Sequence, residues 1–348
     1  MPSPSRRPGR GPRPQPARRR GPGPESDSTQ RRPGRVRPDS RRSIPASLSA
    51  PPPLPPPPPH DPGPIVRAGL VAFIGRTNVG KSSLINALVG SKVSIVTPKP
   101  QTTRHPVHGV LARSGSQIVL VDTPGFFETH KSRLVDRLHE RARAALEGID
   151  AVVHVVDPSR PPGAEDQMVL AALKPLTQPR ILCLNKSDLR HRPHREAWLG
   201  RRADYTGVLE VSARTGAGLG ALLDALAPLV PEGPALYPPG EVTNVQREFR
   251  IAELIREKVY LLTHDEVPYR TAIELDLVED RVGRDGEPFI HVKAAILVAV
   301  ERYKGMLIGA GGSRIRDIGI AARRDLEPLL GRQVFLDLAV IVDPKLDP

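Results

Sequence analysis

The chain has one cysteine, Cys183, among its 348 residues, and aromatic residues make up only 3% of it. A single cysteine allows no internal disulfide and no cysteine-based zinc cluster, so we expect a reducing compartment. Long apolar runs are also missing. The longest, residues 294–300, has the length of a strand and is far shorter than the roughly 18 residues of a membrane-spanning helix. We expect no secretory signal, because no apolar stretch follows the basic start.

Acidic and large apolar residues are scarce in the first 64 residues, which hold 13 arginines, four acids and 21 of the chain's 41 prolines. Such a composition cannot bury enough apolar surface to offset the entropy lost on ordering. The sequence therefore predicts a disordered Pro/Arg-rich extension over 1–64. Its role has several interpretations. It is a basic tail that lies in solvent or contacts RNA phosphates, an organelle transit peptide, or upstream sequence included by a wrong start site.

Residues 66–232 alternate short apolar runs with amphipathic stretches. This order predicts an α/β domain with a mostly parallel sheet and helices on both faces. A strand over 107–111, joined by a short turn to a strand over 118–121, should form an antiparallel edge hairpin. The other strands are expected at 68–74, 151–156, 181–184 and 208–211, and the helices at 81–88, 131–146, 165–173 and 219–229.

A stretch rich in proline and glycine, 233–245, predicts a stiff linker. The order of elements changes beyond it and indicates a complete small α+β domain over 246–343. We expect a helix at 246–262, strands at 271–278 and 289–300 around a loop at 279–287, helices at 303–307 and 313–330, and a last strand at 334–342.

A glycine-rich loop directly follows the first predicted strand and leads into a helix. It fits GxxxxGK[ST], in which backbone N–H groups surround phosphate oxygens and the helix N-terminus adds a favourable dipole. We expect Lys81 to bridge the β- and γ-phosphates and Ser82 to offer its hydroxyl to Mg²⁺. An ordinary glycine turn is the alternative. The predicted phosphate-binding residues are Gly75, Arg76, Thr77, Asn78, Val79, Gly80, Lys81 and Ser82.

A second motif, Asp122-Thr-Pro-Gly125, stands at the end of a strand, where open α/β sheets bind their ligands. We expect Asp122 to hold Mg²⁺ through water and the Gly125 N–H to meet the γ-phosphate. Between the two motifs, Thr103 rather than Thr102 should complete the Mg²⁺ shell only while the γ-phosphate is present, which would make this loop a switch. A polar loop without a metal role is the alternative.

A third motif predicts the choice of base. The carboxylate of Asp188 can accept hydrogen bonds from the guanine N1–H and exocyclic amine, a pair that adenine does not offer. Asn185 can brace the loop, the stem of Lys186 can lie on the ring, and the turn at Ser212-Ala213 can supply an N–H to guanine O6. With the phosphate loop, the predicted GTP-binding set comprises Asp122, Thr123, Pro124, Gly125, Phe126, Asn185, Lys186, Ser187, Asp188, Ser212 and Ala213.

Phe126 occupies the position where Ras-like enzymes carry a glutamine that orients water, so we expect slow intrinsic hydrolysis. Asn78 has two interpretations of equal weight, a ligand for K⁺ beside the phosphates or a brace within the loop. The residues expected to carry catalysis are Lys81, Thr103, Asp122 and Gly125.

The second domain contains a GxxG loop between two predicted helices. Such a loop clamps the nucleotide backbone in a KH domain. Alone it is a weak signal, because glycines often cap helices, but the α-β-β-α-α-β order around it favours the KH interpretation. The predicted RNA-contacting residues are Lys304, Gly309, Ala310, Gly311, Gly312, Arg314 and Arg316, with Arg323 and Arg324 as further basic side chains.

Residues 67–343 resemble the Era family of GTPases. The resemblance is carried by GRTNVGKSSLIN (75–86), PQTTRH (100–105), DTPGF (122–126), NKSD (185–188), SAR (212–214), DEVPYR (265–270) and IGAGGSRIRDIG (308–319). It implies a Ras-like G domain joined to a type II KH domain, and a monomeric Mg²⁺-dependent GTPase. It also implies binding of 16S rRNA near its 3′ end, a role in processing that RNA and in 30S subunit biogenesis, and a cytoplasmic location, partly peripheral on the membrane.

The sequence departs from that family in three places. Residues 1–64 have no counterpart, the middle of the GxxG loop (Ala310, Gly311) carries no basic residue, and the last strand lacks the tryptophan and lysines of similar proteins. A second hypothesis is a membrane-associated regulatory GTPase, with the basic tail as anchor and the KH fold as a protein-binding module. A metabolic NTPase or P-loop kinase is disfavoured, because neither needs a guanine-reading motif.

Overall fold

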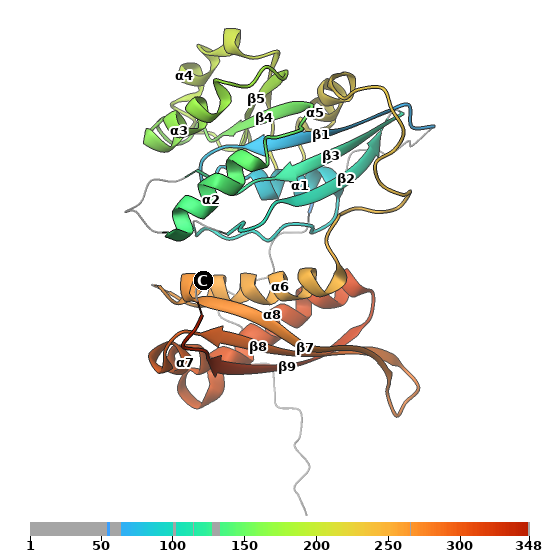
Figure 1. The fold of residues 1–348 in the computed structure, drawn as a ribbon, viewed down its shortest axis with the longest axis vertical. Helices are drawn as coiled ribbons and strands as arrows, with labels where there is room; N and C mark the ends of the chain where they lie inside the picture. The colour runs from blue at the N-terminus through green and yellow to red at the C-terminus, as the bar shows by residue number, and fades with distance from the viewer. Residues whose placement is uncertain are drawn as a thin grey trace, which may run out of the picture. The chain divides into compact units, whose positions relative to one another are not determined.

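A computed structural model describes residues 54–55, 64–99, 102–113, 115–126, 133–264 and 266–346. Apart from residues 54, 55 and 64, the extension predicted to be disordered lies outside the described residues, as do Pro100, Gln101 and Asp265 of the family motifs. The described part of the chain contains two sheets, and each sheet is packed against its own helices (Figure 1).

The first sheet has six strands in the order β2-β3-β1-β4-β5-β6, and all neighbours are parallel except the β2–β3 pair. This confirms the mostly parallel sheet with one antiparallel edge hairpin. The strands are β1 (Arg67–Ile74), β2 (Val107–Arg113), β3 (Ser116–Asp122), β4 (Ala151–Val156), β5 (Arg180–Leu184) and β6 (Gly207–Glu210).

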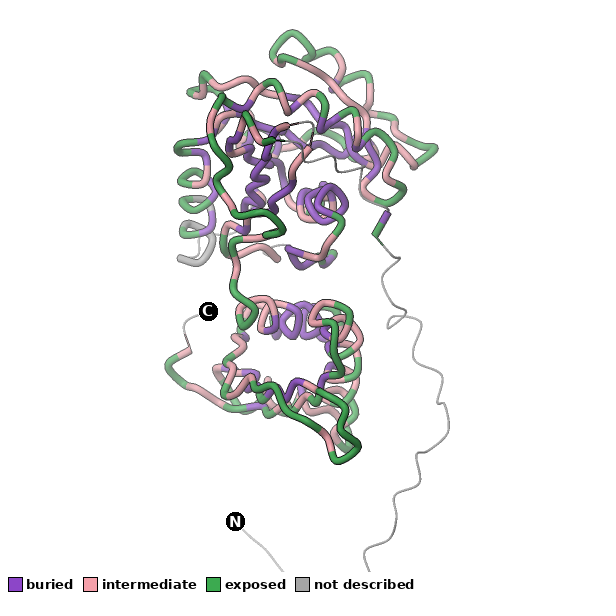
Figure 2. The backbone as a smooth tube through the Cα atoms, turned by 90° about the vertical axis from the view of Figure 1, so that its right-hand side faces the viewer, coloured by how far each residue is buried: buried purple, intermediate pink, exposed green. Residues whose placement is uncertain are grey.

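Helices cover both faces of this sheet, and its central strands β1, β3 and β4 are largely buried (Figure 2). Helices α1 (Lys81–Val89) and α5 (Leu219–Leu226) pack on one face. The other face is covered by α2 (Arg133–Ala144), α3 (Ala164–Leu173) and the short α4 (Arg195–Leu199). The sequence did not predict α4, which is too short for a periodic signal and is fixed by the burial of Trp198 against β4 and β5.

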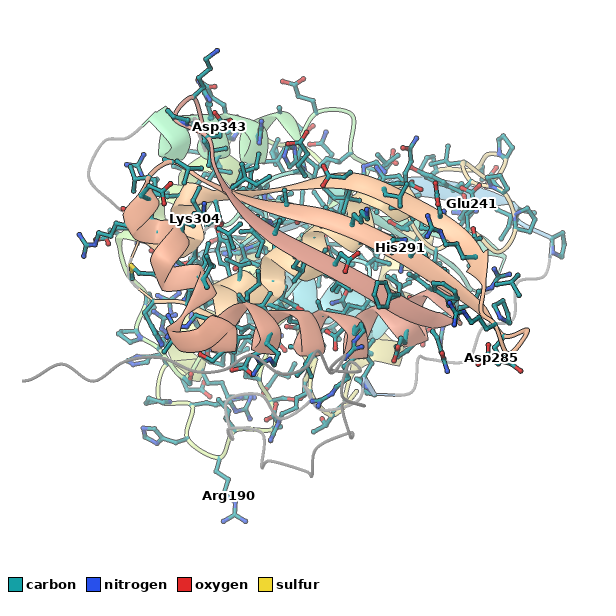
Figure 3. The ribbon with its side chains drawn as sticks, turned by 90° about the horizontal axis from the view of Figure 1, so that it is seen from below. Arg190, Glu241, Asp285, His291, Lys304 and Asp343 are labelled. Atoms are coloured by element: carbon teal, nitrogen blue, oxygen red, sulfur yellow. The ribbon has the colours of Figure 1, made fainter. Side chains whose placement is uncertain are left out.

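The second sheet has three strands in the order β7-β8-β9, with β9 parallel to β8. Its elements are α6 (Arg247–Leu262), β7 (Thr271–Val282), β8 (Pro288–Val298), α7 (Glu301–Ile308), α8 (Ser313–Leu330) and β9 (Gln333–Val342). All three helices pack on one face. The opposite face carries His291, whose Nε2 lies 3.0 Å from Asp337 Oδ2 (Figure 3). The element order and the α+β class are those predicted for a KH domain.

Strand β7 is longer than predicted. Residues 279–282, expected in a loop, continue the ladder as far as the pair Val282–Pro288. Their charged side chains resemble a loop sequence, but both faces are solvent-exposed there, so the cross-strand pairing decides the structure.

The segment 233–245, predicted as a stiff linker, lies along the β2–β3 edge. Gln117 Oε1 accepts hydrogen bonds from the backbone N–H groups of Leu236 and Tyr237 at 2.7 and 2.9 Å. The Val110 N–H donates to the carbonyl of Val242 at 2.9 Å. The linker is therefore attached to the first sheet along its length.

Candidate functional site

The phosphate loop between β1 and α1 has the backbone geometry that its glycines predict. Gly80 has φ +100°, and a Cβ there would overlap the side chain of Asn185. Lys81 is buried, and its Nζ donates to the carbonyls of Gly75 and Arg76 at 3.0 and 3.1 Å. Burial lowers the pKa of Lys81 to about 8. A Cβ at Gly125 would lie 3.0 Å from Lys81 Nζ and 3.1 Å from the Thr77 Cα, so glycine lets the loop after β3 approach the phosphate loop closely.

Three oxygen-bearing side chains meet beside this loop. Ser82 Oγ donates to Asp122 Oδ2 at 2.7 Å, and Thr103 Oγ1 lies 3.3 Å from both Ser82 Oγ and Asp122 Oδ2. Asp122 is fully buried, and burial raises the pKa of its carboxyl. Within the described residues its second oxygen, Oδ1, has no hydrogen-bond partner. A buried carboxylate with an unpartnered oxygen and two hydroxyls is a donor set that fits Mg²⁺, which prefers oxygen ligands.

The predicted base-reading loops also come together. Asn185 joins the phosphate loop to the Ser212-Ala213 turn. Its Nδ2 donates to the Val79 carbonyl at 2.9 Å, and its Oδ1 accepts the Ala213 N–H at 3.1 Å. Asp188 accepts hydrogen bonds from Ser212 Oγ at 2.6 Å and from Arg214 Nε at 2.9 Å. Burial acts to raise the pKa of Asp188, but these two bonds hold it below its ordinary value. The carboxylate is therefore ionised and ready to accept hydrogen bonds at neutral pH.

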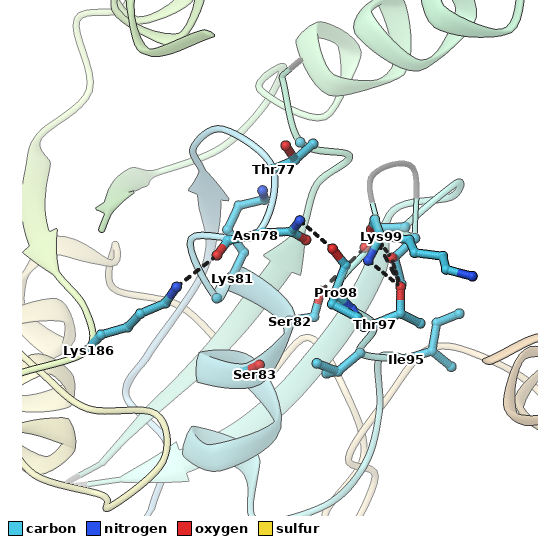
Figure 4. A pocket seen from close by; sticks show the side chains of 15 residues that line it. Thr77, Asn78, Lys81, Ser82, Ser83, Ile95, Thr97, Pro98, Lys99 and Lys186 are labelled. Atoms are coloured by element: carbon cyan, nitrogen blue, oxygen red, sulfur yellow. Dashed lines mark hydrogen bonds between the residues drawn. The ribbon is translucent and has the colours of Figure 1, made fainter. Parts of the chain in front are cut away.

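Two adjoining cavities lie over these loops. The first, of about 280 Å³, is lined by the phosphate loop, Gly125, Thr103 and residues 95–99 (Figure 4). The second, of about 660 Å³, is lined by Asn185, Asp188 and Arg214, among others. Both are bordered by Gly80, Ser83, Val96 and Lys186, so they share a boundary. A ligand with phosphates at one end and a flat base at the other fits this pair.

Four side chains of the predicted set point elsewhere. Arg76 donates to Asp166 Oδ2 at 3.0 Å in a buried ion pair with α3. The hydroxyl of Thr123 donates to the Phe73 carbonyl at 2.7 Å. Val79 and Phe126 are buried in the apolar core. In these residues only the backbone is placed to meet a nucleotide.

The motifs in the sequence did not predict a role for the side chain of Asp157. Asp157 follows β4 and accepts a hydrogen bond from Lys186 Nζ at 2.6 Å, and the same amine donates to the Asn78 carbonyl at 3.2 Å (Figure 4). Asp157 thereby fixes Lys186, whose backbone has φ +62°. Its position directly after a buried strand was the available signal, since polar residues at strand ends meet at one edge of a parallel sheet.

The described residues between α1 and β2, 92–99 and 102–104, contact helix α6 at several points. Ile95 packs in the core of the second domain beside Ile251 and Ile255. The Val96 N–H donates to Glu257 Oε1 at 2.8 Å, and Arg256 Nη2 donates to the Thr102 carbonyl at 2.5 Å. These contacts place Thr103 between the metal-site oxygens and α6.

Arg104 continues this set of contacts on the other side of Thr103. Its Nη2 donates to the Tyr260 hydroxyl at 3.1 Å and to the Tyr269 carbonyl at 3.3 Å, and its Nη1 donates to the Thr271 carbonyl at 3.4 Å. Both neighbours of Thr103 are thus held by the second domain. No local pattern in the sequence predicts these long-range bonds.

The GxxG loop joins α7 to α8. Gly309, Gly311 and Gly312 all have positive φ, at 71°, 58° and 74°. A Cβ at Gly309 would lie 2.9 Å from the Arg314 Cβ, whereas one at Gly311 would meet no atom within 4 Å. Lys304 stands on α7 (Figure 3), and Arg314 Nη1 donates to the Met306 carbonyl at 3.3 Å. The loop therefore presents backbone beside the N-terminus of α8, which favours anions.

This arrangement defines a P-loop G domain followed by a KH domain. A family model described as a 50S ribosome-binding GTPase matches residues 70–186, and a KH-domain model matches residues 266–346. The GTPase Era of Geobacter metallireducens (strain ATCC 53774 / DSM 7210 / GS-15) is 39% identical over 279 residues, which span 79% of this chain and 92% of that protein. The chain belongs to the Era family of GTPases.

Two crystal structures of Era resemble the whole two-domain part. One, with MgGDPNP and nucleotides 1506–1542 of 16S ribosomal RNA, is 35% identical with a TM-score of 0.74. The other, a variant of Aquifex aeolicus Era bound to GDP·AlF₄⁻, is 35% identical with a TM-score of 0.73. Each match covers 80% of this chain and 95% of the other. The chain is thus a Mg²⁺-dependent GTPase, and its second domain is a KH domain, a type of domain that binds RNA.

Nucleotide binding should take up a proton at Lys81. The free amine has a pKa of about 8, and phosphate oxygens beside it would raise that pKa in the complex. A group whose pKa rises on binding favours binding at low pH, and this gain is lost as the pH rises above about 8. Calorimetry of GDP binding without Mg²⁺ at pH 8, in buffers of different ionisation enthalpy, should show uptake of about half a proton. Equal uptake by Lys81→Met would contradict the assignment.

Proposed function

We propose that this GTPase binds 16S rRNA near its 3′ end, assists maturation of that RNA and assembly of the 30S subunit, and couples RNA binding to the bound nucleotide. One observation carries the coupling: Thr103 contacts the metal-site carboxylate, while its two neighbours are bonded to the KH domain. The RNA assignment is supported by the Era structure that contains nucleotides 1506–1542 of 16S rRNA.

The nucleotide site is proposed to work through the loops described above. The phosphate loop and Lys81 hold the phosphates, the Gly125 N–H meets the γ-phosphate, and Asp188 reads guanine, with Asn185 and the Ser212-Ala213 turn as its support. Ser82 and Thr103 would coordinate the Mg²⁺ ion, and Asp122 would hold it through water. The ion, when bound, neutralises charge on the β- and γ-phosphates.

Coupling would run along a contiguous set of contacts. Thr103 stays at the metal site while the γ-phosphate is present and is released after hydrolysis. Because Thr102 and Arg104 are bonded to α6 and its flanking residues, release of Thr103 loosens those contacts. Helix α6 packs against α8, and α8 begins at the GxxG loop. Nucleotide state would therefore shift the population of RNA-binding arrangements.

Guanine selectivity should depend on the carboxylate of Asp188. Asp188→Asn removes an acceptor for two guanine N–H groups, which should cost roughly a hundredfold to ten-thousandfold in GTP affinity. The amide can donate to the 2-oxo group of xanthine, so XTP should then be preferred. Competition of GTP, XTP and ATP against a fluorescent GDP measures the change. Unchanged preference for GTP would contradict the assigned role, and tight binding of XTP by the variant serves as the control for an intact phosphate loop.

Potassium is proposed to support hydrolysis. Phe126 is buried and offers no group to position water. Asn78 lies over the phosphate cavity with its Nδ2 donating to the Pro98 carbonyl at 2.6 Å (Figure 4). This bond also fits the brace interpretation, so both interpretations remain in the proposal, with the side-chain oxygen Oδ1 of Asn78 as the atom that would bind a cation.

GTP hydrolysis should be severalfold faster in KCl than in NaCl at equal ionic strength, because K⁺ would add positive charge beside the phosphates. Steady-state phosphate release at saturating GTP measures this difference. Asn78→Ala should remove the dependence on the cation. Equal rates in the two salts for the unaltered protein would leave Asn78 as a brace only.

RNA is proposed to contact the GxxG loop (Gly309, Ala310, Gly311 and Gly312) with Lys304, Arg314 and Arg316 around it. Neither middle residue is basic, so phosphate contact would rest on backbone N–H groups, the α8 N-terminus and these side chains. We expect the full chain to bind a 3′-terminal 16S oligonucleotide more tightly with MgGDPNP than with GDP. Equal affinity in the two states would contradict coupling, and no affinity in either would contradict the RNA assignment.

A charge at Gly311 should weaken RNA binding without disturbing the fold. The position has φ +58° and open space for a side chain, and aspartate and asparagine tolerate that backbone better than other residues. Gly311→Asp should reduce RNA affinity about tenfold, since one carboxylate faces the phosphates. Gly311→Asn, which has the same shape and no charge, should bind almost as tightly as glycine. Equal losses for the two variants would contradict phosphate contact at this loop.

We further propose that the chain divides into a GTP-binding domain over 66–232, a linker over 233–245 and a type II KH domain over 246–343. A monomer in the cytoplasm, partly peripheral on the membrane, is the arrangement that the family resemblance favours. No described helix is long and apolar enough to cross a bilayer. Binding to anionic vesicles rather than to the oligonucleotide would favour the membrane-regulatory alternative.

A further inference from the structure

Leu54 and Pro55 are the two described residues of the proline-rich stretch in the N-terminal extension, and both lie against the first domain. Pro55 is buried, and Leu54 is 39% exposed. A Cβ on Gly216 would lie 3.1 Å from Pro55 Cβ and 3.7 Å from Pro55 Cγ. The ring of Pro55 therefore packs on the turn that follows Ser212, the residue whose hydroxyl is bonded to Asp188.

Leu54 and Pro55 also line the larger of the two cavities, together with Asp188, Ala213 and Arg214. About 660 Å³ of space remains in that cavity with both residues in place, within the range of ordinary ligand sites. The segment is thus a wall of the cavity and leaves room for a base. Its apolar atoms offer a flat aromatic ring a surface that can exclude water.

We propose that Leu54 and Pro55 form a wall of the guanine-nucleotide site and slow the release of bound nucleotide. The inference rests on the proposed assignment of guanine to the Asp188 loop. Consecutive prolines restrict the backbone before it docks, so seating this segment costs less entropy than seating a flexible tail. The extension, which lies outside the family resemblance, thereby adds a contact to the nucleotide site.

The dissociation rate of a fluorescent GDP from the full chain tests the proposal. Leu54→Ser should raise the rate roughly threefold to tenfold, because the partly exposed side chain has only part of its apolar surface to bury against the base. Leu236→Ser makes the same change at a 50% exposed leucine that does not line the cavity, and it should leave the rate unaltered. Equal rates for Leu54→Ser and the unaltered protein would overturn the proposal.

Alkylation of Leu54→Cys gives a second readout that does not depend on affinity. The native Cys183 is buried with no exposed surface, and burial raises the pKa of its thiol, so the introduced thiol is the reactive one. Saturating GDP should slow its reaction with iodoacetamide, and ADP should not. Equal reaction rates with and without GDP would contradict the proposal that Leu54 and Pro55 form a wall of the nucleotide site.

The two proposals fail separately. If the unaltered protein binds no guanine nucleotide, the proposed base-reading site fails and the wall fails with it. If the unaltered protein binds GDP but Leu54→Ser leaves the release rate unaltered or GDP fails to protect Leu54→Cys, only the proposal about Leu54 and Pro55 is wrong. Faster release together with GDP protection supports it.

Discussion

The buried carboxylate of Asp122 is the constraint on which the nucleotide site depends. An ionised carboxylate is costly to bury, and burial raises the pKa of Asp122, while hydrogen bonds from Ser82 and Thr103 and the charge of Lys81 oppose this rise only in part. These partners come from two separate segments, the start of α1 and the segment that holds Thr103, which the carboxylate therefore holds at one edge of the sheet. A divalent cation at the unpartnered oxygen would complete this balance.

The same site is connected to the KH domain through α6. Lys92, near the end of α1, donates to Glu257 and Asp325 at 2.6 Å each, and Lys258 is paired with the same two carboxylates. Glu257 also accepts the Val96 N–H. Two positive and two negative side chains thus join the segment after α1, which leads to Thr103, to α6 and α8. In such a buried group, removal of one member leaves an unbalanced charge, so the four act as a unit.

The sequence predicted those features whose chemistry is local. Phosphate loops, metal carboxylates and GxxG loops each need particular residue types at fixed short spacings, so these motifs and the alternating strands were visible without coordinates. The buried ion pair of Arg76 with Asp166 could not be predicted from the sequence, because a side chain in a motif can turn away from the ligand. The bonds from α6 to Thr102 and Val96 join residues more than 150 positions apart, and no pattern encodes such partners. Strand β7 exceeded its predicted length because pairing outweighed composition.

The attachment of residues 236–244 to β2 has a consequence for association between molecules. An open sheet exposes unpaired N–H and carbonyl groups along its outermost strand, and these groups can recruit a strand from another chain. Here the Val110 N–H is taken by Val242, the His108 N–H by Asn244, and Gly109 bridges Thr243. The segment that connects the two domains therefore also shields this border from intermolecular β-pairing and lowers the tendency of the protein to aggregate there.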